Sequence, residues 1–311
     1  MEIFMTGATG VVGRRAVPLL VHAGHKVSAV VRSTAKAVEF ERAGARAVEV
    51  DLMDPVDLRR ALVGHEVLVN LATHIPSSTL RMFLPGSWRE NDRIRTVGAA
   101  NLVDAALAVG VSRLIQESFA PGYPDSGEVW IHEDTPLAPA RYNRSTLDAE
   151  AAAQRFGNAV VLRFAAFYGP DAAQTKVMVD TVRRGFAPLP GAEDAYVSSL
   201  SHDDAATAVV AALRLPAGAY NVSDNEPLRR SAFAAALAGA LDLPTPRPVP
   251  RWLTALTGSL GELMSRSLRI SNRKLCRNSD WRPMLPSMRE GWPATVAEMR
   301  ARDADAEQRT A

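Results

Sequence analysis

A glycine-spaced turn near the start of the chain constrains the fold more than any other segment. The turn is Thr6-Gly7-Ala8-Thr9-Gly10-Val11-Val12-Gly13, and it joins an apolar run, Glu2–Thr6, to an amphipathic pattern, Val11–Ala23. Glycines at these positions let the chain turn tightly out of a strand, let its backbone approach a bound group and let the next helix pack closely on the sheet. The pattern therefore predicts a strand–turn–helix unit built around a close backbone contact.

The rest of the first half repeats the alternation of short apolar runs and helical patterns. Such a rhythm, with strands that are apolar throughout, predicts an α/β fold with a doubly wound parallel sheet covered by helices on both faces. After Phe164 the segments become richer in Pro, Arg and loops. We expect a Rossmann domain at 1–166, its sheet completed by about 198–222, then a smaller discontinuous C-terminal substrate lobe at 167–301 and a flexible tail at 302–311.

Composition narrows the class of protein further. The 311 residues are 47% apolar, and a net charge of +2 gives no reason to expect nucleic acid or an anionic membrane surface as a partner. The single cysteine, Cys276, can form neither an internal disulfide nor a thiolate metal site. The segment His132-Glu133-Asp134 has no second His at ligand spacing, so no metal is expected. With no signal-peptide pattern and no bilayer-length apolar run, we expect a cytoplasmic protein that acts on a small molecule.

The glycine turn itself predicts a dinucleotide site, with a purely structural turn as the alternative. The start of a helix offers unpaired N–H groups and the positive end of a dipole to phosphates. Because this turn follows a strand and opens an amphipathic helix, cofactor binding is the favoured interpretation. The residues expected to contact the cofactor in this turn are Gly7, Thr9, Gly10, Val11, Val12 and Gly13.

The end of the second strand favours NADP over NAD. An acid that binds the ribose would fall about 20 residues after the turn, but the chain has Arg32 and Ser33 there. A guanidinium fits a 2′-phosphate bidentately, although Arg32 as a solvated charge is the alternative. After the third strand, Asp51 and Leu52 are placed for the adenine. After the fourth strand, the residues expected to face the dinucleotide are Leu71, Ala72 and Thr73.

These and later motifs together resemble the extended short-chain dehydrogenase/reductase family, in its NAD-dependent epimerase/dehydratase branch. Besides the glycine turn, the matching segments, in chain order, are Asp51-Leu52, Asn70-Leu71-Ala72, Leu162-Arg163, Tyr168-Gly169-Pro170, His202-Asp203-Asp204, Tyr220-Asn221-Val222, Ser271-Asn272, Trp281-Arg282-Pro283 and Arg289-Glu290-Gly291. The resemblance covers nearly the whole chain and implies a Rossmann fold with redox chemistry on a carbonyl or alcohol.

The same resemblance identifies a departure at the expected catalytic positions. The family uses a Tyr, a Lys four residues later, and a Ser or Thr after the fifth strand; here Tyr142 is present, but Thr146 stands in place of the Lys. Ser118 lies one residue before the usual hydroxyl position. A cation beside Tyr lowers the pKa of the phenol, so its loss weakens Tyr142 as a base. Arg95, in place of a family Asn, and Arg144 are candidate replacement cations, and Thr146 is a candidate ribose or water ligand.

Two further residues are candidates for acid–base chemistry. His74 follows the Leu71–Thr73 segment and would titrate near neutral pH, with an ordinary loop histidine as the alternative. Glu117 ends the fifth strand beside Ser118, and it either faces away from the crevice or has a role there.

Three functions remain open at this point. The favoured one is an NADP(H)-dependent oxidoreductase or epimerase-like enzyme with an altered proton relay. The second is a non-redox cyclase, dehydratase or lyase that keeps the dinucleotide as a structural group, and the third is a non-enzymatic NADP sensor. For the apolar segment Trp252–Met264 three interpretations stay open. It could cover the pocket, form a face of a possible homodimer, or pack in the core.

Overall fold

A seven-stranded parallel sheet forms the centre of the computed structural model, which describes residues 1–31, 34–76, 79–82, 84–249, 261 and 264–310. Its strands lie in the order β11-β7-β5-β4-β1-β2-β3, and every neighbouring pair runs parallel. The strands are β1 (Glu2–Thr6), β2 (Lys26–Val31), β3 (Arg46–Glu49), β4 (Val67–Asn70), β5 (Arg113–Phe119), β7 (Ala159–Phe164) and β11 (Gly218–Val222). This order confirms the predicted doubly wound Rossmann fold.

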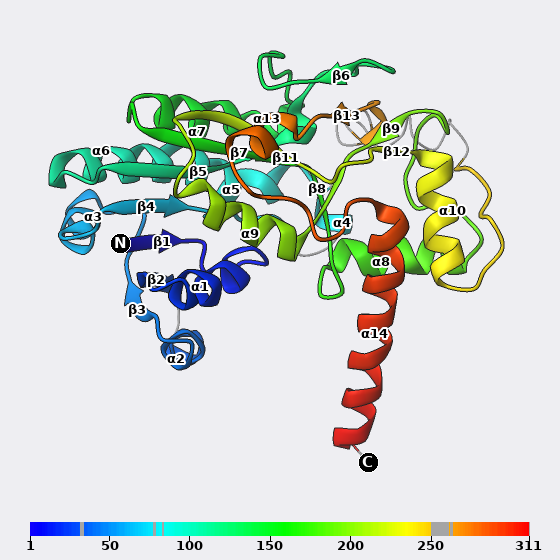
Figure 1. Ribbon diagram of the computed structural model, residues 1–311, viewed down its shortest axis with the longest axis horizontal. Helices are drawn as coiled ribbons and strands as arrows, with labels where there is room; N and C mark the ends of the chain where they lie inside the picture. The colour runs from blue at the N-terminus through cyan, green and yellow to red at the C-terminus, as the bar shows by residue number, and fades with distance from the viewer. Residues whose placement is uncertain (32–33, 77–78, 83, 250–260, 262–263, 311) are drawn as a thin grey trace.

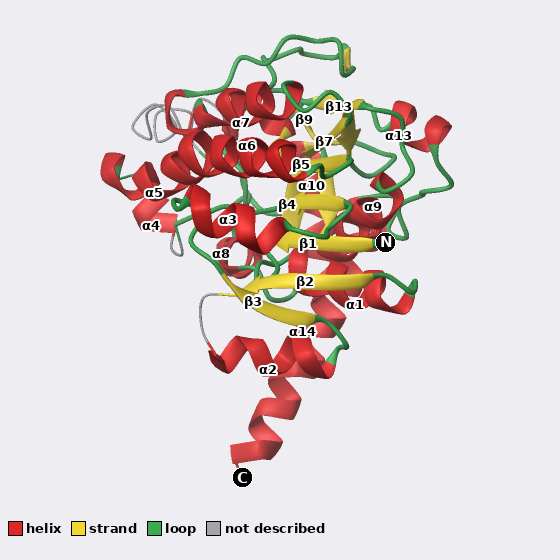
Figure 2. Ribbon diagram, turned by 90° about the vertical axis from the view of Figure 1, so that its left-hand side faces the viewer, coloured by secondary structure: helices red, strands yellow, loops and turns green. Residues whose placement is uncertain are grey.

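Helices cover both faces of this sheet, as Figure 2 shows. One apolar core includes side chains of α1 and α9, and the other includes side chains of α3, α6 and α7. The bounds are α1 (Gly13–His22), α2 (Thr34–Arg42), α3 (Pro55–Leu62), α6 (Ala99–Val109), α7 (Ser145–Gln154) and α9 (His202–Ala212). All parallel strands end at one edge, so the segments that follow β1, β4 and β5 meet there.

The sequence pattern from about Trp88 to Val109 predicts one long helix, but the structure divides this stretch, and the segment that leads to α6 is irregular. It consists of α4 (Thr79–Met82), a 3-10 turn η1 (Pro85–Trp88), α5 (Arg89–Arg93) and a π-helical turn η2 (Ile94–Gly98) that leads into α6. A π turn widens the helix by one residue and changes the direction in which its side chains point. Arg95 is buried within this turn.

Segments from the second half gather around a separate apolar core. It includes Tyr168, Phe233 and Trp292, and it lies among α8 (Ala173–Arg183), α10 (Arg230–Ala240) and the start of α14 (Met288–Thr310). Three two-stranded ladders lie outside the central sheet: β8 (Ala166–Tyr168) with β10 (Ser199–Ser201), β9 (Tyr196–Val197) with β12 (Leu228–Arg229), and β6 (Trp130–Ile131) with β13 (Arg269–Ile270). The remaining elements are the turns η3 (Ala120–Gly122) and η4 (Arg141–Asn143) and the helix α13 (Arg273–Asn278).

The C-terminal tail expected at 302–311 forms the end of a helix, and its flexibility stays a prediction. Helix α14 continues to Thr310 and runs outward from the body of the protein (Figure 1), with residues 301–308 exposed. Ala, Glu and Arg favour helix, and Glu298 pairs with Arg302 one turn later at 2.6 Å. Helix propensity and this pair account for a regular helix without a buried face.

Candidate functional site

The glycine turn forms a closed cradle between β1 and α1. Gly7 has a φ of +69°, and a Cβ atom added there would collide with the backbone of Leu71. A Cβ on Gly13 would collide with the carbonyl oxygen of Gly7, while the amide of Gly10 donates to that same oxygen at 3.0 Å. The cradle therefore requires glycine at positions 7 and 13, for a backbone conformation and a close approach that no side chain permits.

Helix α1 begins at the rim of this cradle without a side-chain cap. Val12 occupies the N-cap position and makes no side-chain cap hydrogen bond, and the first turn contains no acidic residue. The N–H groups of an uncapped start attract an anion. Together with the cradle, this end of α1 fits the pyrophosphate of a dinucleotide.

A line of hydrogen bonds joins the ends of three neighbouring strands. Thr6 of β1 donates its hydroxyl to Asn70 Oδ1 at 2.6 Å, and Asn70 Nδ2 donates to Gln116 Oε1 of β5 at 2.9 Å. Asn70 Oδ1 also accepts from the amide of Ala72 at 3.2 Å. These bonds place the predicted cofactor segment Leu71–Thr73 directly against Gly7.

The predicted adenine-side residues have different outcomes. Arg32 and Ser33 lie outside the described residues. Asp51 is exposed and its Oδ1 accepts from the amide of Met53 at 2.9 Å, while Leu52 is half-buried beside Gly98. The roles of Asp51 and Leu52 stay predictions.

Tyr142 lies in η4, immediately before α7. Its ring packs on Trp88 of η1, with 4.7 Å between the ring centroids. Burial raises the pKa of the phenol above its ordinary value, and the positive charges of Arg266 and Arg95 offset this only in part. A phenol in this setting keeps its proton at neutral pH, so it can donate a hydrogen bond but is a poor base.

Thr146 and Glu117 belong to one buried polar cluster, joined by Arg95. Arg95 Nη1 donates to Thr146 Oγ1 at 2.9 Å, and Arg95 Nη2 lies 2.5 Å from Glu117 Oε1. The side chains of Arg95 and Glu117 are only 5% and 13% exposed. The guanidinium therefore lies beside the position where the family Lys would stand, but it comes from a different helix and carries its own counter-ion.

Ser118 belongs to a second buried cluster. Its hydroxyl donates to Glu150 Oε1 at 2.5 Å, and Glu150 forms a bidentate ion pair with Arg163 at 2.9 and 2.8 Å. Arg163 Nη1 also donates to the hydroxyl of Tyr123 at 2.7 Å. The structure thus separates Ser118 from the Thr146 cluster, and the catalytic role predicted for Ser118 stays a prediction.

His74 is exposed, and its backbone rather than its imidazole is fixed. The amide of His74 donates to Asn91 Oδ1 at 3.0 Å, which holds the Leu71–Thr73 segment against α5. An exposed imidazole can reach a ligand only from the solvent side of this segment. The catalytic role predicted for His74 also stays a prediction.

Sequence reasoning missed two buried amides at this edge. Within the described part of the chain, Asn91 Nδ2 has no hydrogen-bond partner, and neither Nδ2 nor Oδ1 of Asn143 has one. Both residues are at most 1% exposed. Asn143 lies directly between Tyr142 and α7, and no spacing or motif identifies it, because its burial depends on how η4 packs.

A cavity of about 360 Å³ is lined by Pro124, Asp125, Ala138, Ser265 and Arg266. Arg266 Nη1 donates to the carbonyls of Tyr123 and Ala138 at 2.9 and 2.7 Å. Since the charge of Arg266 also acts on Tyr142, this cavity is the candidate substrate pocket.

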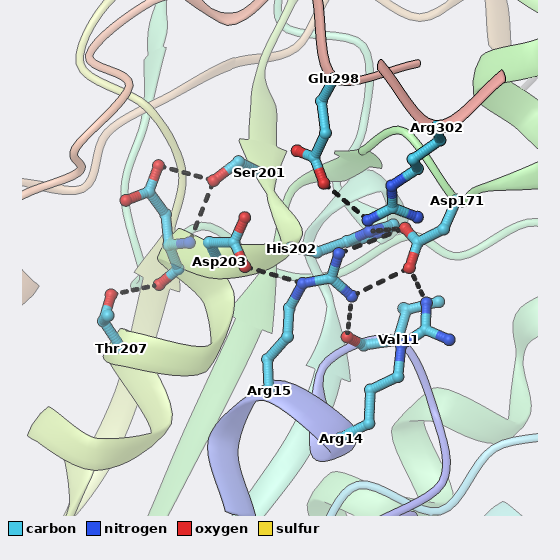
Figure 3. A network of polar contacts seen from close by, with 11 residues as sticks. Val11, Arg14, Arg15, Asp171, Ser201, His202, Asp203, Thr207, Glu298 and Arg302 are labelled. Carbon is cyan, nitrogen blue, oxygen red and sulfur yellow. Dashed lines mark hydrogen bonds and ion pairs between the residues drawn. The ribbon is translucent and has the colours of Figure 1, made fainter. Parts of the chain in front are cut away.

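A third network ties α1 to the second half of the chain (Figure 3). Asp171 pairs with Arg14 and with Arg15, and its Oδ1 lies 3.2 Å from His202 Nδ1. Burial, with the charges of Arg15 and Arg14, lowers the pKa of His202 to about 3. The imidazole is therefore neutral at physiological pH and acts as a structural donor that links α1, Asp171 and α9.

Comparison with known proteins agrees with this geometry. A family described as NAD(P)H-binding matches residues 7–216. A 3-diazoavenalumate denitrifying reductase from a Streptomyces species is 32% identical over 308 residues, covering 94% of this chain and 99% of the relative. A ceramide reductase from Caulobacter vibrioides is 27% identical and covers 94% and 89%.

Solved structures give the same result for the fold. Thermus thermophilus UDP-glucose 4-epimerase in complex with NAD superposes with a TM-score of 0.75 at 25% identity, covering 96% of this chain and 99% of that chain. Human epimerase family protein SDR39U1 with NADPH has a TM-score of 0.80 at 18% identity and covers the same shares. The chain therefore belongs to the NAD(P)H-binding family, as an atypical member of the epimerase/dehydratase-like short-chain dehydrogenase/reductases.

Among the described residues, no helix combines the length and the apolar character that crossing a lipid bilayer requires.

Proposed function

We propose that this protein is a reductase that uses NADPH to transfer hydride to a strongly electrophilic small molecule. One observation carries the proposal: the cation that contacts Thr146, where the family Lys would stand, is Arg95, which is already paired with Glu117. Among the described residues, the charges of Arg266 and Arg95 only partly offset the burial that raises the pKa of Tyr142, so this phenol is a poor base for oxidising an alcohol. Reduction of an acceptor that needs little acid–base assistance fits these residues best.

The cofactor preference rests on the chain near β2. NADP is favoured because Arg32 and Ser33 follow β2 and no acidic residue stands there. The glycine cradle, the uncapped start of α1 and the Leu71–Thr73 segment would hold the dinucleotide. When bound, the reduced nicotinamide supplies hydride, and Tyr142 would orient the acceptor by donating a hydrogen bond.

The acceptor class follows from the chemistry and from one relative. The Streptomyces relative is named for the reductive removal of nitrogen from a diazo compound. An aryl diazonium accepts hydride at its terminal nitrogen to give a diazene, which loses N₂ and leaves a C–H bond. The hydrogen on nitrogen then leaves as a proton while N₂ departs, and the ring carbon takes up a proton, so the hydride-transfer step itself needs no base. We propose an aryl diazonium or a comparably electrophilic acceptor, bound in the cavity lined by Arg266.

The test is NADPH oxidation with two matched substrates, an aryl diazonium carboxylate and the corresponding aryl ketone, each corrected for the reaction without enzyme. One N₂ should be released for each NADPH oxidised, and deuterium on the transferring face of NADPH should slow NADPH oxidation. Tyr142→Phe should keep kcat for the diazonium within about threefold, because hydride transfer to nitrogen requires no proton. A loss of 100-fold or more, about 2.7 kcal/mol, would show that Tyr142 is a required acid or base.

The same measurements separate the two alternative functions. A non-redox enzyme would convert its substrate without net oxidation of NADPH. A sensor would bind NADPH and turn over neither substrate.

A further inference from the structure

Arg95 and Glu117 have hydrogen-bonding capacity that the protein itself does not use. In the part of the chain that the structure describes, Arg95 Nε and Glu117 Oε2 are buried atoms without a hydrogen-bond partner. A buried charged group normally fills its hydrogen bonds, because each unsatisfied atom loses its hydration without a replacement. One donor and one acceptor are thus left over within a single ion pair.

The position of the pair supplies an independent reason to expect a ligand. Glu117 lies near the end of β5, at the strand edge where open α/β sheets bind ligands. Arg95 lies in the π-helical turn η2, an irregularity that is rare in helices and frequent at functional sites. Helix α7 brings Thr146 to the same guanidinium from the other side.

We infer that Arg95 and Glu117, with Thr146 as their positioning residue, bind the ribose diol of the nicotinamide nucleotide. Each hydroxyl of a diol both donates and accepts, so one can donate to Glu117 Oε2 and the other can accept from Arg95 Nε. Both protein atoms belong to one ion pair, in which Arg95 Nη2 and Glu117 Oε1 lie 2.5 Å apart, so a single diol has a donor and an acceptor in the same pair. This inference rests on the binding of a nicotinamide dinucleotide, but not on the proposed hydride acceptor.

The arrangement also differs from the family lysine, whose cation lowers the pKa of the neighbouring phenol. Arg95 supplies the contact to the ribose, while Glu117 neutralises its charge. Tyr142 therefore receives little stabilisation of its anion, which agrees with the raised pKa that burial gives this phenol.

Binding assays test the inference without any turnover. NADPH affinity should fall about tenfold in Arg95→Gln and in Glu117→Gln, and two- to threefold in Thr146→Val, which acts only through Arg95. A tenfold loss is about 1.4 kcal/mol. Adenosine 2′,5′-bisphosphate, which has the adenine end of NADP but no nicotinamide ribose, should bind all three variants as it binds the parent protein.

Ser145→Ala is the matched control. Ser145 is the neighbour of Thr146 on α7, is 5% exposed and donates its hydroxyl to Asp92 at 2.7 Å. Its loss removes a hydrogen bond of similar burial, but it should leave NADPH affinity within twofold. Thermal unfolding of each variant without ligand identifies any general loss of structure.

A reciprocal exchange provides the second arm. Arg95→Asn should lose NADPH affinity, and Thr146→Lys added to it should restore affinity by returning the cation to α7. The doubly changed protein should also titrate Tyr142 at a lower pH than the parent does. Unchanged NADPH affinity in Arg95→Gln and Glu117→Gln, or an equal loss of bisphosphate binding, would overturn the inference, even if the reductase activity is found.

Discussion

Two buried ion pairs lie beneath helix α7, and they differ in how completely their atoms are satisfied. Glu150 pairs with Arg163, and four residues earlier Thr146 contacts Arg95 of the Arg95–Glu117 pair, so both reach the same face of the helix. Arg163 makes bonds through Nε, Nη1 and Nη2. Among the described residues, Arg95 Nε and Glu117 Oε2 have no partner.

The comparison teaches that burial of a charge does not by itself identify its role. Both pairs are almost inaccessible to solvent, with every side chain at most 13% exposed. The closed pair, Glu150–Arg163, joins β5, β7 and α7 and has its guanidinium bonds filled. The open pair, Arg95–Glu117, lies at the strand edge with a donor and an acceptor unused, which is the arrangement expected of a binding site.

The largest effect should come from breaking the closed pair. Arg163→Met leaves Glu150 buried without its counter-ion and should cost about 3–5 kcal/mol in the free energy of unfolding. Arg95→Met removes a guanidinium with fewer bonds and should cost less, on the order of 1–3 kcal/mol. Urea unfolding of both variants without cofactor measures the difference, and a greater loss in Arg95→Met would reverse the comparison.

A smaller effect should distinguish structure from catalysis at Ser118. Ser118→Ala removes the hydroxyl that donates to Glu150 and should cost about 1–2 kcal/mol of stability. NADPH affinity and kcat should stay within twofold, since Ser118 belongs to the closed pair. If kcat falls tenfold or more while stability is unchanged, Ser118 is catalytic, as its position after the fifth strand predicts.

The smallest effect concerns a buried carboxyl that belongs to neither ion pair. Asp224 follows β11 and is 2% exposed, and neither oxygen of its carboxyl group has a hydrogen-bond partner within the described structure. Burial, with the charges of Glu226 and Asp204, raises the pKa of Asp224 well above its ordinary value of 3.8. We expect this carboxyl to be a stability cost rather than a ligand site, because its charge acts on the buried Tyr168 of the second core and helps to raise the pKa of that phenol.

The pH dependence follows from the direction of that shift. The unfolded chain releases the proton of Asp224 near pH 3.8, whereas the folded chain keeps it to a higher pH, so stability is lost as pH rises. Asp224→Asn should therefore be more stable than the parent at neutral pH, by on the order of 1 kcal/mol. Unfolding at several pH values should show this advantage shrinking toward pH 4, with NADPH affinity unchanged. Loss of NADPH binding would place Asp224 among the ligand residues.

The sequence by itself determined the fold and the family. The spacing of Gly7, Gly10 and Gly13 depends only on local backbone geometry, and the alternation of apolar strands with amphipathic helices is a property of neighbouring residues. The missing lysine at position 146 could also be read directly, because a motif fixes where it belongs.

Only the tertiary structure decided what surrounds Thr146. Arg95 reaches it across 51 positions of sequence, from a π-helical turn within a segment whose pattern suggests one regular helix. Neighbouring residues of β5, Glu117 and Ser118, belong to different ion pairs because different elements pack against them. Side-chain partners depend on how helices pack on the sheet, and that packing depends on contacts between residues far apart in the chain.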